Sequence, residues 1–140
     1  MTHPTQVYSP KGRLIDPDAT SDERSYALLT HLSLLGHVVV PYFAIAVPIV
    51  MYLAKKGQSP FIDDHAKEAM NFQITLVIYT LVLPAIAGLI GLLTCGVGLI
   101  LLVPAIIGPY VLGLIGMIMA STAANRGEFF RYPMNFRLIH

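Results

Sequence analysis

Two long stretches of this sequence contain no charged side chain, and they constrain the fold more than any other feature. One lies between Arg24 and Lys55, and the other between Glu68 and Arg126. A bilayer core about 30 Å thick needs about 20 apolar residues of helix, so the second stretch can cross a membrane twice. Backbone groups in lipid need internal partners, which leaves helices or closed barrels, and these runs lack the alternation of barrel strands. We therefore predict an all-α integral membrane protein.

The composition supports this prediction. The 140 residues are 55% hydrophobic and 12% charged, whereas soluble domains carry about 25% charged residues. All nine Lys and Arg and all eight Asp and Glu lie within 11–24, 55–68 and 126–137. A net charge of +1 gives no reason to expect nucleic acid as a partner. The polar N-terminus lacks the apolar run of a cleavable signal peptide, so we expect the first membrane segment to be retained.

Turn and cap signals divide the chain. Prolines and polar residues predict a disordered tail over residues 1–20, followed by a membrane domain over 21–139. We expect hydrophobic blocks at 25–54, 69–93 and 97–124, a charged loop at 55–68 and an amphipathic tail at 125–140 that lies in the headgroup layer. Thr20 and Glu23 have the spacing of a capping box, and Ser59 with Pro60 is typical of a second helix start.

The first hydrophobic block is too long for one simple span. As a straight helix it would measure about 45 Å, and it contains Pro41 and Pro48. We predict a break between Gly36 and Tyr42, which leaves a kinked span or a hairpin. A hairpin would place all nine Lys and Arg on one membrane face, and the positive-inside bias favours it. Each half would have only about 13 to 16 residues, which is short for a full crossing, so we expect a re-entrant or interfacial hairpin.

The rest of the bundle is predicted to be a transmembrane helical hairpin with its turn at 94–98, where two glycines permit a tight reversal. Pro84 is expected to soften the exit of the second helix. Pro104 and Pro109 are expected to interrupt the third block.

A polar stripe enters the second block. Helical geometry places five residues within an arc of about 80°; we call this set the polar stripe, and it consists of Asp64, Glu68, Asn71, Thr75 and Tyr79. Polar groups in hydrocarbon are costly unless paired. The stripe therefore predicts either hydrogen bonds that pack helices or a translocation path or ligand site. With the neighbouring His65, its members are the candidate functional residues.

Small residues line one face of the third block, namely Gly113, Gly116, Ala120 and Ala124. Such residues let helices approach closely in lipid. They predict packing within the chain, with association of two copies as the alternative. His31 and His37 point in different directions on a helix and are expected to make local hydrogen bonds.

No catalytic motif is present. The sequence has no Gly-x-Ser-x-Gly, no glycine-rich phosphate loop and no His-Glu-x-x-His. We therefore expect a protein without enzymatic activity, without a cofactor and without a bound metal.

Three strings carry a family resemblance. They are Glu23-Arg24 with ALLTHLS at 27–33, SPFIDDHAKEAMNFQ at 59–73, and ANRGE at 124–128 with RYP at 131–133. Together they resemble the small prokaryotic membrane proteins related to the twenty-kilodalton subunit of the chloroplast inner-envelope protein translocon, the Tic-twenty-like family. The resemblance implies three or four hydrophobic helices and, by distant kinship, a part in protein translocation.

The resulting hypothesis is a non-enzymatic multi-pass membrane protein that serves as a subunit or accessory of a transport or protein-translocation assembly. The alternative is a structural or lipid-interacting membrane protein. The expected partners of the chain are the lipid bilayer and other membrane proteins or a second copy of the chain. We expect the chain to lie in the prokaryotic plasma membrane, with both termini and the 55–68 loop in the cytoplasm.

Overall fold

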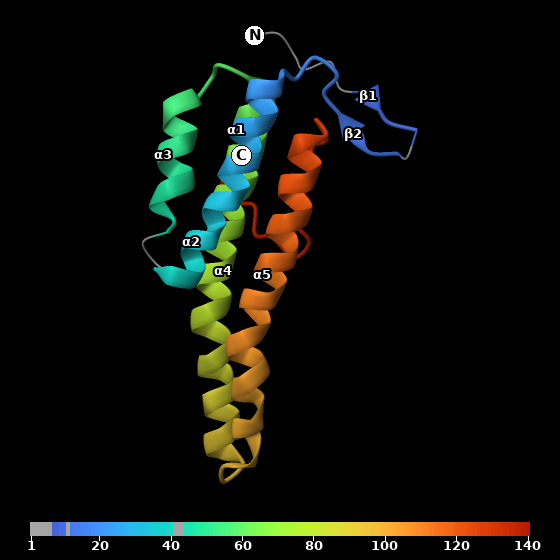
Figure 1. Cartoon of the computed structure of the whole chain (residues 1–140). Coiled ribbons are helices and arrows are strands. Elements are labelled where there is room, and N and C mark those ends of the chain that lie inside the picture. The colour runs from blue at the N-terminus through green and yellow to red at the C-terminus, as the bar shows by residue number, and fades with distance from the viewer. Residues whose placement is uncertain (1–6, 11, 41–43) are drawn as a thin grey trace.

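The computed structural model describes residues 7–10, 12–40 and 44–140. Its elements are β1 (Val7–Tyr8), β2 (Leu14–Ile15), α1 (Ser21–Leu32), the 3-10 helix η1 (Ser33–Leu35), α2 (Gly36–Val39), α3 (Ala46–Lys55), α4 (Pro60–Leu93), the 3-10 helix η2 (Val97–Leu101) and α5 (Leu102–Asn125). Figure 1 shows α4 and α5 side by side as a long hairpin, with α1, α2 and α3 flanking only its upper part.

Both predicted helix starts are confirmed. Thr20 caps α1 and forms the capping box with Glu23, whose carboxylate accepts a hydrogen bond from the Thr20 amide at 2.7 Å. Ser59 caps α4, and Pro60 is its first residue. Pro60 has no amide hydrogen to leave unpaired at this position, so the helix starts without cost.

The first hydrophobic block turns back on itself, as the hairpin prediction required. The chain descends through α1, η1 and α2 and returns through α3 (Figure 1). The Tyr26 hydroxyl in α1 donates to the Met51 carbonyl in α3 at 2.7 Å. The predicted break lies partly at residues 41–43, outside the described residues. Pro48 does not break α3, because it falls in the first turn, where it costs little.

α4 and α5 are long and apolar enough to cross a membrane, as judged by length and composition. They meet at a turn in which Gly96 has φ +95°. The expected interruptions do not occur, because α4 continues through Pro84 and α5 continues through Pro109. Pro104 lies in the first turn of α5. A proline removes one backbone hydrogen bond, which a long apolar helix can tolerate.

The expected disordered tail differs from the structure over its described part. β1 and β2 pair in antiparallel fashion, with Val7 opposite Ile15. The Asp16 amide donates to the Gly127 carbonyl at 2.9 Å, so this hairpin is fastened to the end of α5. Sequence composition could not reveal this contact, because its partner lies more than a hundred residues away.

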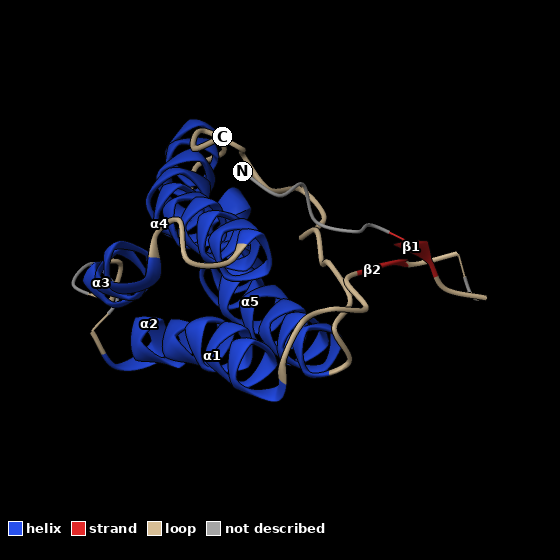
Figure 2. Ribbon diagram, turned by 90° about the horizontal axis from the view of Figure 1, so that it is seen from above, coloured by secondary structure: helices blue, strands red, loops and turns tan. Residues whose placement is uncertain are grey.

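Two small apolar clusters form the core at the charged end of the bundle. One contains Leu34, Phe72, Leu76, Met117, Ala120 and Tyr132, and the other contains Ala19, Ala27, Phe61 and Ala124. Viewed from above, α1 packs beside both α4 and α5, while α3 packs against α4 (Figure 2). Beyond this end, large apolar side chains of α4 and α5 are exposed.

Candidate functional site

The polar stripe faces the chain's own C-terminal segment, residues 128–140. Its outermost member, Asp64, accepts two hydrogen bonds of 2.6 Å from the Arg131 guanidinium. One turn further along α4, Glu68 is 4% exposed and accepts from the Tyr132 amide at 2.8 Å. Its carboxylate also accepts from the Asn135 side-chain amide at 3.0 Å. These carboxylates tether the start of the segment to α4.

Asn71 holds the end of the same segment. Its side-chain oxygen accepts from the Leu138 amide at 2.9 Å and from the Ile139 amide at 2.8 Å. Its side-chain nitrogen donates to the Ile139 carbonyl at 2.8 Å. The Asn71 side-chain amide thus both donates to and accepts from the backbone of the C-terminal segment, as the backbone of a paired β-strand would.

The two innermost members of the stripe hold the point where the segment reverses. The Thr75 hydroxyl accepts from the Phe136 amide at 2.9 Å and lies 2.9 Å from the Asn135 side-chain oxygen. The Tyr79 hydroxyl donates to the Met134 carbonyl at 2.9 Å. An irregular segment must find partners for its backbone groups, and the stripe supplies them. The segment therefore runs along α4, and its predicted place in the headgroup layer remains a prediction.

His65 lies beside the stripe and belongs to a buried aromatic network. Its Nδ1 is 2.8 Å from Nε2 of His31, and Nδ1 of His31 is 2.9 Å from the Tyr132 hydroxyl. Tyr132 in turn stacks on Phe72, with ring centroids 3.7 Å apart. A hydrogen bond between two imidazoles needs one neutral acceptor nitrogen. The network therefore joins α1, α4 and the C-terminal segment, and the expected local bonding of His31 is wrong.

A second buried polar pair lies deeper in the bundle. The Gln73 side-chain nitrogen is 2.8 Å from Nδ1 of His37, which joins α4 to α2. His37 was also expected to bond locally, and its partner is again on another helix. The sequence did not predict this pair, because nothing in the spacing of Gln73 indicates a histidine 36 positions away.

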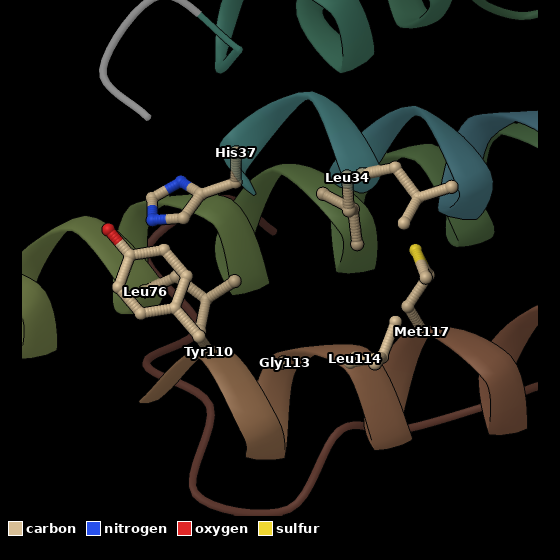
Figure 3. A pocket seen from close by; sticks show the side chains of 8 residues that line it. Leu34, His37, Leu76, Tyr110, Gly113, Leu114 and Met117 are labelled. Carbon is tan, nitrogen blue, oxygen red and sulfur yellow. The ribbon is translucent and has the colours of Figure 1, made fainter. Parts of the chain in front are cut away.

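A small pocket adjoins this pair (Figure 3). It is lined mainly by apolar side chains, with His37 and Tyr110 as the polar exceptions, and the Tyr110 hydroxyl points toward the His37 ring. Its volume of about 20 Å³ leaves room for about one water molecule. A pocket of this size cannot take a small-molecule substrate.

The small residues of α5 make their contacts inside the chain. A methyl group at Gly113 would lie 3.3 Å from the Leu76 side chain, and one at Gly116 would lie 3.0 Å from the Tyr132 ring. Ala120 and Ala124 are fully buried in the two core clusters. This face of α5 therefore receives α4, α1 and the C-terminal segment.

Ion pairs reinforce the charged end. Glu128 lies 2.9 Å from Arg126 and 2.7 Å from Arg13, so it links the end of α5 to the β-hairpin. The hydrogen bond from Arg126, supported by Arg13, lowers the pKa of the Glu128 carboxyl to about 2. Across the described part of the chain, no three His, Cys, Asp or Glu side chains form a group that could hold a metal ion.

The fold and the site together define a class: a small, mostly helical protein with two apolar helices long enough to span a membrane, whose polar stripe binds its own C-terminal segment. The model of the magnetosome magnetite crystal formation protein family matches residues 22–139. This chain belongs to that family. No curated protein and no solved structure matched it.

The family assignment corrects the resemblance to the Tic-twenty-like family. The most specific string behind that resemblance, 59–73, contains the cap of α4 and the side chains that hold the histidine network and the C-terminal segment. Such residues report how a small helical bundle is held together. They do not indicate what the bundle does, so they led to the wrong family.

Proposed function

We propose that this chain is a non-enzymatic, multi-pass membrane protein that takes part in magnetite crystal formation. The observation that carries the proposal is the family match, which includes both long apolar helices, the flanking hairpin and almost all of the C-terminal segment. The function in magnetite formation comes from the family's description. The structure adds two helices that are long and apolar enough to span a membrane.

Three features support a role without catalysis. The polar stripe, which was the candidate for a path or ligand site, is filled by the chain's own backbone. The pocket beside His37 has room for about one water molecule. The sequence has no recognisable catalytic motif. Protein translocation is not part of the proposal, because the resemblance that suggested it was wrong and the stripe is occupied.

We further propose that the charged end lies at the cytoplasmic face of a prokaryotic membrane. The first block returns to the end where it began, so the eight Lys and Arg among the described residues lie in segments at one end of the bundle. Such a distribution is favoured on the cytoplasmic side. The lipid bilayer is then the principal partner, with other membrane proteins or a second copy as further ones.

The test is deletion of the gene in a magnetite-forming host, with crystals counted and measured by electron microscopy. We expect the deletion to change crystal number or size and the wild-type chain to restore both. Asn125→Ala, an exposed change at the end of α5, should restore them equally. Crystals unaffected by the deletion would favour the alternative, a purely structural or lipid-interacting membrane protein.

A further inference from the structure

The chain is broad at its charged end and narrow at the other (Figure 1). At the charged end, α1, α2, α3 and the C-terminal segment surround α4 and α5. The deepest polar contact of this flanking part joins Tyr79 of α4 to Met134 of the C-terminal segment. About 14 residues of α4, or about 21 Å, continue beyond Tyr79. Along that length, the described part of the chain contributes only α4, η2 and the start of α5.

The narrow part exposes apolar side chains on both of its helices. On α4 these include Leu89 at 57% and Leu92 at 78% exposure, and on η2 and α5 they include Ile100 at 76% and Val103 at 62%. Such surfaces fit lipid chains and do not fit water. The narrow end therefore belongs in the bilayer, where it displaces only the cross-section of two helices.

The flanking hairpin fits one leaflet. α3 has ten residues, so it is about 15 Å long, half of a hydrocarbon core of about 30 Å. Its outward side chains are apolar, with Val50 and Leu53 each 63% exposed. At its end, the Lys55 ammonium lies 5.9 Å from the centre of the Tyr26 ring. Lysines and tyrosines are typical of the lipid headgroup boundary.

We propose that the chain is a membrane wedge, which binds preferentially to bilayers that are convex on the side of its charged end. A protein that adds cross-section to one leaflet alone expands that leaflet relative to the other. The bilayer then bends away from the expanded side, so the insertion costs less in a membrane that is already curved in this way. This inference rests on the proposed membrane insertion and adds the shape of the membrane that the chain fits.

The test uses the full chain labelled with a fluorophore at Cys95, its single cysteine, which is exposed at the narrow end. The labelled chain is reconstituted into giant vesicles of phosphatidylcholine and phosphatidylglycerol. A membrane-impermeant quencher then removes the signal of molecules whose narrow end faces outward. The remaining fluorescence reports molecules whose charged end is outside, and a thin tube is pulled outward from the vesicle.

We expect the protected signal, normalised to a lipid dye, to be enriched about twofold or more in the tube, whose outer leaflet is strongly convex. Equal density in tube and vesicle, or depletion from the tube, would overturn the inference. A chain that alkaline carbonate extracts from the vesicles would overturn the proposed membrane insertion itself, which separates the two failures.

Matched variants locate the wedge. Val50→Ser with Leu53→Ser makes the outer face of α3 polar, and we expect the enrichment to fall toward one because the hairpin withdraws from the leaflet. Leu92→Ser with Leu93→Ser removes as many exposed apolar side chains at the narrow end and should leave the enrichment unchanged. Circular dichroism confirms that each variant is folded. An equal loss in both variants would contradict the assignment to α3.

Discussion

Asn71 shows how a polar residue in an apolar helix can serve the fold. Its amide group makes three hydrogen bonds, all to the backbone of Leu138 and Ile139. The carboxylate of Glu68, which is almost completely buried, accepts a hydrogen bond from the Tyr132 amide of the same segment. A buried carboxylate is costly without partners, and the C-terminal segment supplies them. The polar stripe and the C-terminal segment therefore supply each other's hydrogen-bond partners.

Replacing Asn71 tests this account at the level of a single side chain. Asn71→Ala removes three hydrogen bonds, each with a net value of about 0.5–1.5 kcal/mol. We expect the end of the C-terminal segment to detach, with a loss of about 2–4 kcal/mol in the free energy that holds it. Hydrogen exchange of the Leu138 and Ile139 amides measures this directly.

The matched control for that experiment is Asn125→Ala, which removes an exposed amide side chain at the end of α5. It should leave the exchange of both amides as in the wild type. If Asn71→Ala also leaves their protection intact, the hydrogen bonds described for Asn71 do not hold the segment.

The residues of the histidine network could not be assigned from the sequence. His31 and Tyr132 are 101 positions apart, and no periodicity relates them. What the sequence does contain is a histidine one position after a stripe residue, which was noted as a candidate without a role. The role depends on α1 and the C-terminal segment meeting at the same place, which only the folded chain reveals.

At the scale of elements, residues close together in the sequence predicted where the helices start, whereas contacts between distant residues could not be predicted. The caps of α1 and α4 involve residues within four positions of each other, so spacing alone identifies them. The contacts between the stripe and the C-terminal segment join residues 55 to 69 positions apart. The stripe was therefore found as a pattern, while its partner was not.

The close approach of α5 to the C-terminal segment can be tested at Gly116. A leucine there would drive its side chain into the Tyr132 ring, which lies 3.0 Å from the position of the first added carbon. Overpacking of this kind costs about 1–3 kcal/mol. We expect Gly116→Leu to lower the unfolding temperature in detergent and to release the segment to proteolysis.

Gly108 on the same helix provides the comparison. A side chain there meets nothing within 4 Å, and replacing glycine inside a helix removes a cost of about 1 kcal/mol. Gly108→Leu should therefore be neutral or stabilising. Equal destabilisation by both variants would show that Gly116 is not a packing position.

Glu128 adds an ion pair to the backbone hydrogen bonds that attach the β-hairpin, so the strength of the attachment depends on pH. The folded-state pKa of Glu128, about 2, lies below the ordinary value of 4.5, chiefly because of the hydrogen bond from Arg126. The unfolded or detached state therefore binds the proton first. The contribution of Glu128 is complete above pH 4.5 and is lost as the pH falls from there through about 2.

A spin label at Tyr8→Cys, in a chain with Cys95→Ser, reports this attachment. We expect its spectrum to sharpen across that acidic range as β1 becomes mobile. In Glu128→Gln the label should already be mobile at neutral pH and should not respond in the same range. A spectrum that is unchanged down to pH 2 in the parent chain would remove Glu128 from the account.

At the scale of the whole molecule, the charge-free stretches predicted the helical membrane architecture, and the structure adds its asymmetry. Among the described residues, the returning first block places the charged side chains at one end, while α4, η2 and α5 form the other end. The family match then connects this architecture with magnetite crystal formation.

The most direct test is therefore the side of the membrane from which each end is labelled. Single cysteines are placed at Asp18 and at Gln58, each with Cys95→Ser, and are compared with the native Cys95 in intact membranes treated with an impermeant maleimide. We predict that Asp18→Cys and Gln58→Cys react from the same side and that Cys95 reacts from the opposite side. Reaction of positions 18 and 58 from opposite sides, or of Cys95 from the same side as both, would contradict it.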